Sequence, residues 1–179
     1  MQREKNGART IERFSPPQTS FCVIGIDGST GMLEKAKENL RSHKNLALAH
    51  IPLFMIGDMH DLHALGAGSF AGIWSCTALF THTPRQLLGR SLQSVAALLK
   101  TGGMFFASYT NGKVTDTYDK LLASSTGRIK YFSQPDPEEI AGLAEEHGLR
   151  LLKQSTSDFE MNGKVVQRDL FASQFFLKE

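Results

Sequence analysis

The sequence predicts an α/β fold in which a mostly parallel β-sheet carries helices on both faces and ends in an antiparallel hairpin. Short apolar segments alternate along the chain with segments whose apolar residues recur every three or four positions. Such an alternation of strands and helices is typical of a parallel sheet. The last two apolar segments are instead joined by a short turn containing Asn162-Gly163, which predicts an antiparallel pair.

The first predicted unit is a buried strand at residues 21–27 followed by a helix from Ser29 to about residue 42. The strand is apolar and stops on Asp27. Ser29 is a favourable N-cap, and the apolar residues after it recur at helical spacing. A second apolar run, residues 53–56, also ends on a glycine and an acid, Gly57 and Asp58. The preceding proline suits the start of a strand.

The later elements follow the same logic. A strand at 70–76 precedes a helix that opens on Pro84, carries Lys100 in its last turn and stops at Gly102-Gly103. The other predicted elements are a strand at 104–109, a helix around 114–123, an extended segment at 128–132, a helix from Asp136 to His147, and strands at 149–155 and 165–177.

Composition limits the classes of function. The 179 residues fit one domain, and 41% hydrophobic content suffices for a core. The net charge of +2 is spread without long runs of one sign, so we expect no nucleic-acid partner and no membrane surface. No segment predicts a membrane span or a secretory signal, and a cytoplasmic location is expected. Cys22 and Cys76 lie in apolar segments and are predicted to be buried, reduced thiols.

The two acids that end the first two strands are the leading candidates for ligand contact. The carboxyl ends of strands in open α/β sheets face the crevice where ligands bind. There Asp27 could accept hydrogen bonds from both hydroxyls of a ribose, although an acid at this position could also serve only to start a turn. A nicotinamide-dependent enzyme is a competing interpretation, but no glycine-rich dinucleotide fingerprint follows a strand.

Five stretches, taken in order, resemble the class I S-adenosylmethionine-dependent methyltransferases. The resemblance covers about residues 21–177 and implies a Rossmann-like sheet, S-adenosylmethionine as cofactor and methyl transfer to a small-molecule acceptor. The stretches are residues 23–29 with Met32 and Leu33, residues 57–59 with Leu62, residues 70–75 through Leu79, His82 and Pro84, residues 98–104, and residues 138–149.

The resemblance also implies roles for individual residues. Asp27 would bind the ribose hydroxyls, Gly28 and Ser29 would allow backbone to approach the cofactor, and Met32 would pack near the adenine. Asp58 would accept from the adenine amino group, Met59 would donate its amide to the ring, and Ser75 and Cys76 would lie along the methionine part.

Other candidates follow from positions near strand ends. His82, after the strand at 70–76, is the best candidate base because imidazoles titrate near neutral pH. Tyr109 and Asn111 could line the acceptor pocket, although residues at strand ends are more often structural. Trp74 is predicted to lie in the core. His60 and His63 lack a third ligand at suitable spacing, so no metal site is predicted.

The N-terminal segment departs from the family pattern. The family's glycine-rich loop should precede Asp27 by about 20 residues. Residues 3–9 contain one glycine, Gly7, and no preceding apolar strand. The first strand–helix unit is therefore expected to be missing or replaced, as in an N-terminally truncated methyltransferase. Residues 1–20 would be an atypical arm, and residues 21–179 the methyltransferase-like domain.

Three arrangements could compensate for the missing strand. Its neighbours could pair directly, residues 8–14 could occupy its place, or a second chain could supply the contact in a homo-oligomer or strand-swapped dimer. In each case we expect cofactor binding to be weak or absent. A non-catalytic, methyltransferase-like binding or oligomerising module is the alternative function.

Overall fold

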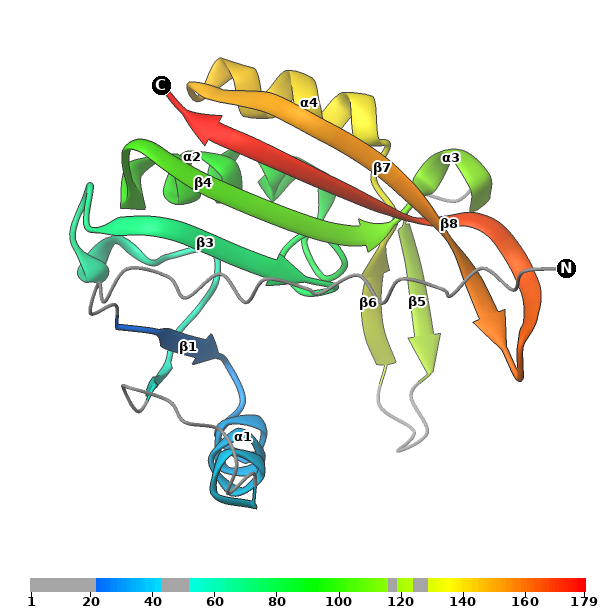
Figure 1. Ribbon diagram of the computed structural model, residues 1–179, viewed down its shortest axis with the longest axis horizontal. Coiled ribbons are helices and arrows are strands. Elements are labelled where there is room, and N and C mark those ends of the chain that lie inside the picture. The colour runs from blue at the N-terminus through cyan, green and yellow to red at the C-terminus, as the bar shows by residue number, and fades with distance from the viewer. Residues whose placement is uncertain (1–21, 43–51, 116–118, 124–128) are drawn as a thin grey trace, which may run out of the picture. The chain divides into compact units, whose positions relative to one another are not determined.

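The computed structural model describes residues 22–42, 52–115, 119–123 and 129–179 of the chain (Figure 1). The chain divides into two compact units, which are the N-terminal unit of residues 1–55 and the C-terminal unit of residues 56–179. The predicted arm at residues 1–20 and the proposed strand substitute at residues 8–14 lie outside the described residues.

The N-terminal unit contains strand β1 (Ile24–Asp27) and helix α1 (Thr30–Ser42), and strand β2 (Leu53–Ile56) follows at the boundary. β1 and β2 form a two-stranded sheet. The N–H of Leu53 donates to the carbonyl oxygen of Val23 at 2.9 Å. Ser29 caps α1, since its Oγ accepts the N–H of Met32 at 3.4 Å. The predicted strand, cap and helix are confirmed, but the prediction that the strand is buried is wrong, since the residues of β1 are only partly buried and Val23 is 49% exposed.

The C-terminal unit is built on a four-stranded sheet of order β3-β4-β8-β7. Its strands are β3 (Phe70–Cys76), β4 (Leu99–Thr110), β8 (Lys164–Lys178) and β7 (Leu149–Met161). β3 and β4 run parallel, while β4–β8 and β8–β7 are antiparallel. Asn162 and Gly163, at the turn between β7 and β8, both have positive φ, 54° and 73°. The α/β class and the antiparallel C-terminal hairpin are confirmed.

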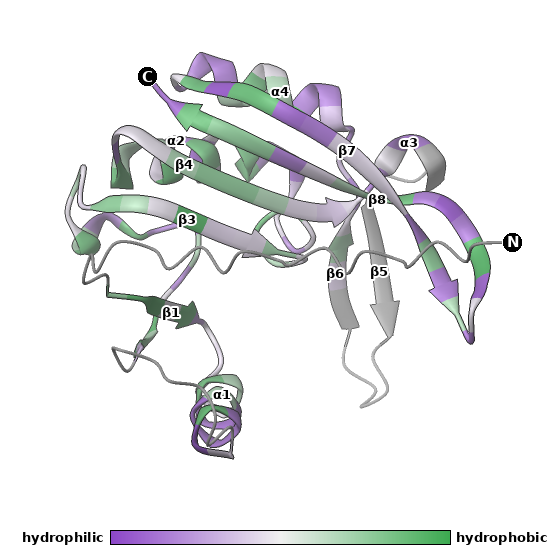
Figure 2. Ribbon diagram, viewed as in Figure 1, coloured by the Kyte–Doolittle hydropathy of each residue, from purple (hydrophilic) through white to green (hydrophobic). Residues whose placement is uncertain are grey.

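Helices α2 (Leu88–Leu98) and α4 (Pro137–Glu146) lie on the same face of this sheet (Figure 1). Alternate residues of β4 and β8 point toward them and are buried, because side chains alternate across a strand. The core is a continuous cluster that includes Leu92, Phe105, Tyr109, Ile140 and Phe176. Figure 2 shows the hydrophobic residues concentrated in β3, β4 and the C-terminal part of β8.

The helix predicted from Pro84 to Lys100 differs from the structure at both ends. Pro84 has extended backbone (φ −55°, ψ 142°) and precedes a 3₁₀ turn, η2 (Arg85–Leu87), so it is not the first helical residue. α2 ends at Leu98 because Leu99 is extended (ψ 136°). Lys100 therefore belongs to β4 and not to the last helical turn.

The helix predicted around residues 114–123 is wrong. The segment contains a short helix α3 (Gly112–Thr115) and a strand β5 (Asp119–Ala123), which pairs antiparallel with β6 (Ile129–Ser133). A helix confined to this segment would be too short to be stable alone. Pairing of β5 with β6 satisfies the backbone hydrogen-bonding groups of this segment instead. The extended segment predicted at 128–132 is confirmed as β6.

The described strands form three separate sheets: β1-β2, β3-β4-β8-β7 and β5-β6. Another short element, the 3₁₀ turn η1 (His63–Leu65), precedes β3. Within the described residues β3 is paired only with β4, and β1 only with β2. Direct pairing of β1 with β3, one of the three expected compensations, is therefore not found among them.

Candidate active site

Asp27 and Asp58 have the same local geometry at the ends of β1 and β2. Oδ1 of Asp27 accepts the N–H of Ser29 at 2.8 Å. Oδ1 of Asp58 accepts the N–H of His60 at 2.9 Å. In each case the side chain bonds to the backbone two residues on, as in an Asx turn. Both acids thus start turns, and in the described part of the chain neither carboxylate makes a further hydrogen bond.

The remaining carboxylate oxygens fit the polar groups of a nucleoside. A carboxylate with a free oxygen accepts from vicinal hydroxyls or from an amino group, which neutral side chains do less strongly. In the N-terminal unit Gly28 and Ser29 are exposed beside Asp27, and Met32 is 59% exposed on α1. In the C-terminal unit Met59, beside Asp58, is partly buried against the core.

The chain bends sharply after β3, where Ser75 and Cys76 were predicted to line the cofactor. Oγ of Ser75 accepts the N–H of Leu79 at 3.0 Å and so stabilises the bend. Thr77 has a φ of 49°, and its N–H donates to the carbonyl oxygen of Ser108 at 2.7 Å. A β-branched residue in the left-handed region is strained. Such strain concentrates at functional sites. No sequence signal pointed to Thr77, because threonine disfavours this conformation.

Both cysteines are free and exposed. The prediction of unpaired thiols is confirmed, but the prediction that they are buried is wrong. Cys76 occupies the last position of β3, which ends the described sheet, and side chains there have no neighbouring strand on one side. Its exposed thiol remains accessible at the carboxyl end of β3.

His82 is exposed, and the β5–β6 hairpin orients its ring. Nδ1 lies 3.1 Å from the carbonyl oxygen of Tyr131. Because a carbonyl only accepts, Nδ1 carries the hydrogen, and Nε2 of the neutral ring keeps its lone pair. The ring also meets Phe132 edge-on, with centroids 6.4 Å apart. This geometry suits a general base.

A group of buried polar side chains near His82 was not found by the sequence reasoning. Side-chain oxygens of Thr81, Ser133 and Gln134 are buried and have no hydrogen-bond partner among the described residues. The N–H of Ser133 donates to the carbonyl oxygen of Thr81 at 2.7 Å, so the two residues are adjacent. Buried polar atoms are costly when unpaired. A polar ligand or water beside them would satisfy them.

Tyr109 and Asn111 have the structural role that is more common for residues at strand ends. Tyr109 is fully buried, and its hydroxyl donates to Oε1 of Gln174 at 2.5 Å. Gln174 Nε2 in turn donates to the carbonyl oxygen of Pro137 at 2.8 Å. Asn111 Nδ2 donates to the carbonyl oxygen of Asp169 at 3.1 Å. These residues join β4, β8 and α4.

Trp74 is 70% exposed, so the prediction that it belongs to the core is wrong. Its ring stacks on Phe106 with centroids 3.9 Å apart and planes 29° apart. The neighbouring Phe105 points the other way, into the core under the helices. Trp74 is exposed because it shares the face of Phe106 on β3, which is the last strand of the described sheet.

His60 is held by a structural hydrogen-bond chain. The Ser91 hydroxyl donates to the carbonyl oxygen of Leu87 at 3.1 Å, so its oxygen accepts from Nδ1 of His60 at 2.9 Å. This contact joins the loop after β2 to α2. The described residues contain no group of three side chains suited to hold a metal ion. None of the described helices is long and apolar enough to cross a membrane.

Acids at the carboxyl ends of strands are common in α/β domains that bind a nucleoside-containing cofactor. Residues 7–103, more than half of the chain, match the family model described as "Methyltransferase domain". The chain therefore belongs to the methyltransferase-domain family. No curated protein matches the chain significantly.

Solved structures share the fold at low sequence identity. An S-adenosylmethionine-dependent methyltransferase from Methanosarcina mazei has a TM-score of 0.71 at 14% identity, with 88% of this chain and 82% of that chain covered. An S-adenosylmethionine-dependent methyltransferase from Mesorhizobium loti has a TM-score of 0.63 at 16% identity, with 87% of this chain and 80% of that chain covered. An S-adenosylmethionine-dependent methyltransferase from Clostridium acetobutylicum has a TM-score of 0.63 at 16% identity, with 86% of this chain and 74% of that chain covered.

These comparisons confirm the family and the Rossmann-like fold predicted from the sequence. All three structures are described as dependent on S-adenosylmethionine, the cofactor that the sequence predicts.

Proposed function

We propose that this protein binds S-adenosylmethionine and transfers its methyl group to a small-molecule acceptor. The observation that carries the proposal is the matched pair of Asx turns at Asp27 and Asp58. Each turn fixes one carboxylate oxygen and leaves the other available to a ligand. Each acid therefore presents a carboxylate oxygen that could accept a hydrogen bond from a polar group of the cofactor.

The protein's residues would act mainly by positioning. Asp27 would accept from the ribose hydroxyls and Asp58 from the adenine amino group, while Met32 and the backbone of Gly28, Ser29 and Met59 would contact the nucleoside. The bound cofactor supplies a methyl group already activated on a positively charged sulfur. Holding an acceptor in line with that methyl group can provide most of the rate enhancement.

His82 would take the proton that the acceptor loses. Nε2 of His82 would accept the O–H or N–H proton of the acceptor, while the bond between the methyl carbon and the cofactor's sulfur would break and S-adenosylhomocysteine would leave. The small net charge of +2 supports a small acceptor over a nucleic acid.

The proposal includes weak cofactor binding. The sequence around Gly7 has one glycine where the family pattern has a glycine-rich loop, and such loops bind through several backbone amides. Fewer amides would leave Asp27 and Asp58 as the main polar contacts. We therefore propose an affinity below that of a methyltransferase with a complete loop.

A non-catalytic module that associates with a second copy is the competing function. Its support is the exposed Trp74 on β3, which is paired on one side only among the described residues. Exposed strand edges favour pairing with another chain. Such a module would not require the matched turns at Asp27 and Asp58, so cofactor titration separates the two functions.

The substitution His82→Asn tests the proposed base. The asparagine amide could still donate to the carbonyl oxygen of Tyr131 but could not accept the proton. We expect methyl transfer to fall by about a hundredfold, the usual effect of losing a general base, with cofactor binding unchanged. The assay follows S-adenosylhomocysteine formation over a panel of small hydroxyl and amino compounds.

The matched control is His63→Asn, an exposed histidine in η1, which should leave the rate unchanged. Equal rates for His82→Asn and the wild-type protein would remove His82 from the mechanism. Turnover with none of the acceptors in the wild-type protein, despite cofactor binding, would favour the non-catalytic alternative.

A further inference from the structure

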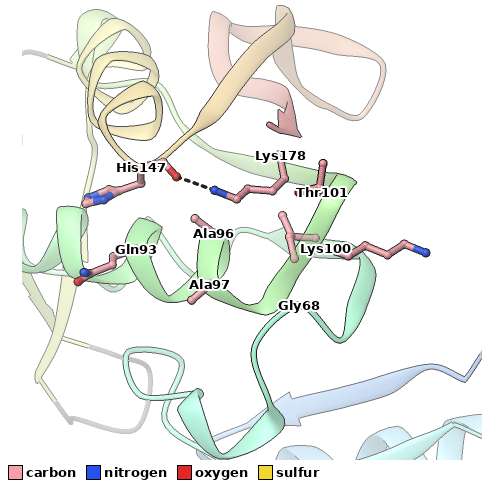
Figure 3. A pocket seen from close by; sticks show the side chains of 9 residues that line it. Gly68, Gln93, Ala96, Ala97, Lys100, Thr101, His147 and Lys178 are labelled. Carbon is pink, nitrogen blue, oxygen red and sulfur yellow. Dashed lines mark hydrogen bonds between the residues drawn. The ribbon is translucent and has the colours of Figure 1, made fainter.

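A cavity of about 460 Å³ lies at the end of the four-stranded sheet where β3 and β4 begin (Figure 3). Leu99 and Thr101 stand at the start of β4, whereas Ser75 and Cys76 stand at the end of β3. A seven-residue strand spans about 20 Å. The cavity is therefore separate from the residues after β3 that are proposed for methyl transfer, and its volume lies in the range of small-molecule sites.

The walls combine an apolar floor with polar side chains. Ala96 and Leu99 are buried and form the floor, and Ala97 lies beside them on α2. Lys178 comes from the end of β8 and His147 from the end of α4 (Figure 3). The remaining lining residues are Gly68, Gln93, Lys100 and Thr101.

The ammonium of Lys178 is the central polar group of the cavity. Nζ donates to the carbonyl oxygen of His147 at 3.2 Å. Gly148 makes room for it, since a Cβ there would lie 2.9 Å from Nζ, and the φ of 71° also favours glycine. Lys178 is partly buried and extends toward the end of α4, whereas Lys100 points away from the cavity (Figure 3).

Lys178 lacks a carboxylate partner within the part of the chain that the structure describes. The neighbouring acid, Glu179, pairs with Arg150 at 2.6 Å. An ammonium has three N–H donors, and one carbonyl satisfies one of them. A partly buried cation without an opposite charge attracts an anion more strongly than a fully solvated one.

The backbone acceptors around the cavity are largely satisfied. The carbonyl oxygen of Ala97 accepts from Gly68, that of Ala144 from His147, and that of Glu145 from Gly148. The carbonyl oxygen of Val95 accepts from Leu99. The helix ends thus offer few acceptors to a ligand. Among the polar lining side chains the Lys178 ammonium only donates, whereas the Thr101 hydroxyl and the Gln93 amide can each donate or accept.

We propose that this cavity binds a small organic oxyanion, with a phosphate or carboxylate group on Lys178 and an apolar part on Ala96 and Leu99. This is a second ligand site, separate from methyl transfer, and it does not depend on the proposed function. The apolar floor predicts that an anion with a hydrocarbon body binds better than a bare anion.

The test is an NMR titration of the ¹⁵N-labelled full chain with phenyl phosphate, and separately with inorganic phosphate. We expect saturable shifts of the amides of Gly68, Thr101 and Gly148, with phenyl phosphate binding more tightly than inorganic phosphate. Added salt should weaken both. No saturable shift of these amides up to about 10 mM, which is weaker than most specific binding, would overturn the proposal.

Two variants locate the site. Lys178→Met keeps the length of the side chain and should weaken phenyl phosphate binding at least about tenfold, as expected for one charge-assisted hydrogen bond. Lys153→Met, an exposed lysine of β7, is the matched control and should bind normally. Equal affinity of the two variants would contradict the assignment.

The second variant, Ala97→Asp, places a like charge in the cavity at an exposed helix position. It avoids the contact of Lys178 with His147 and is expected to fold normally. It should abolish binding of both anions. Unchanged binding in a folded Ala97→Asp protein would show that the anions bind elsewhere.

Discussion

The N-terminal and C-terminal units contrast in how their residues are used. Among the described residues of the N-terminal unit only Leu33 is buried, while β4, β8, α2 and α4 of the C-terminal unit share a continuous core. Yet Asp27, the principal candidate for cofactor contact, belongs to the N-terminal unit. Ligand-binding segments are commonly drawn from the less stable parts of a protein. The contrast therefore concerns packing, because the proposed cofactor contacts come from both units, with Asp27 in the first and Asp58 in the second.

Truncating one buried side chain in each unit should give the largest difference in the free energy of unfolding between the two units. Phe105 is fully buried, with the rings of Phe80 and Phe176 at 6.1 and 5.7 Å. Phe105→Ala should lower the free energy of unfolding by about 3–5 kcal/mol. Leu33→Ala should cost about 2 kcal/mol or less, because few buried neighbours surround it. Urea unfolding measures both, and a larger loss for Leu33→Ala would reverse the comparison.

Removing the buried Tyr109–Gln174 hydrogen bond should give the second-largest change in the free energy of unfolding. Tyr109→Phe leaves the Gln174 oxygen without this donor, and Gln174→Leu leaves the tyrosine hydroxyl without this acceptor. Each should cost about 1–3 kcal/mol. The double variant should cost less than the sum, since it removes both partners together. Additive losses in urea unfolding would show that this hydrogen bond does not link β4 to β8 energetically.

Relief of strain at Thr77 should give the smallest effect, and one of opposite sign. Thr77→Gly should raise the free energy of unfolding by about 1 kcal/mol, because glycine adopts positive φ without a steric penalty. Asn162→Gly is the matched control, with a similar φ of 54° in a turn, and should gain less, since asparagine tolerates this region. A loss of stability in Thr77→Gly would refute the strain.

The sequence predicted the features that depend on local pattern. The strand at 70–76, the cap at Ser29 and the Asn162-Gly163 hairpin turn are all present. The matched acids Asp27 and Asp58 were recognised because each ends an apolar run. Each Asx turn joins residues only two positions apart, so the positions of these acids depend on local sequence.

Features that depend on distant partners were predicted poorly. β5 was mistaken for helix because its pairing with β6 has no local signature. Trp74 was assigned to the core by its hydrophobicity, although its exposure depends on which face of β3 it occupies. For Tyr109 the sequence left open a pocket or a structural role, and it did not indicate the partner Gln174, which lies far along the chain.

The most direct test of the proposed function is calorimetric titration of the wild-type protein and the Asp27→Asn variant with S-adenosylmethionine. Asparagine can still accept the N–H of Ser29 and so preserve the turn, but it lacks the charge that favours the ribose hydroxyls. Glu34→Gln, an exposed acid on α1, is the matched control.

We expect the wild-type protein and the Glu34→Gln control to bind with a dissociation constant of about 0.1–10 mM. The Asp27→Asn variant should bind at least about tenfold more weakly. Equal affinities for wild type and Asp27→Asn, or no binding by the wild-type protein, would contradict the proposed cofactor site. Micromolar binding would instead contradict the proposed weakness of that site.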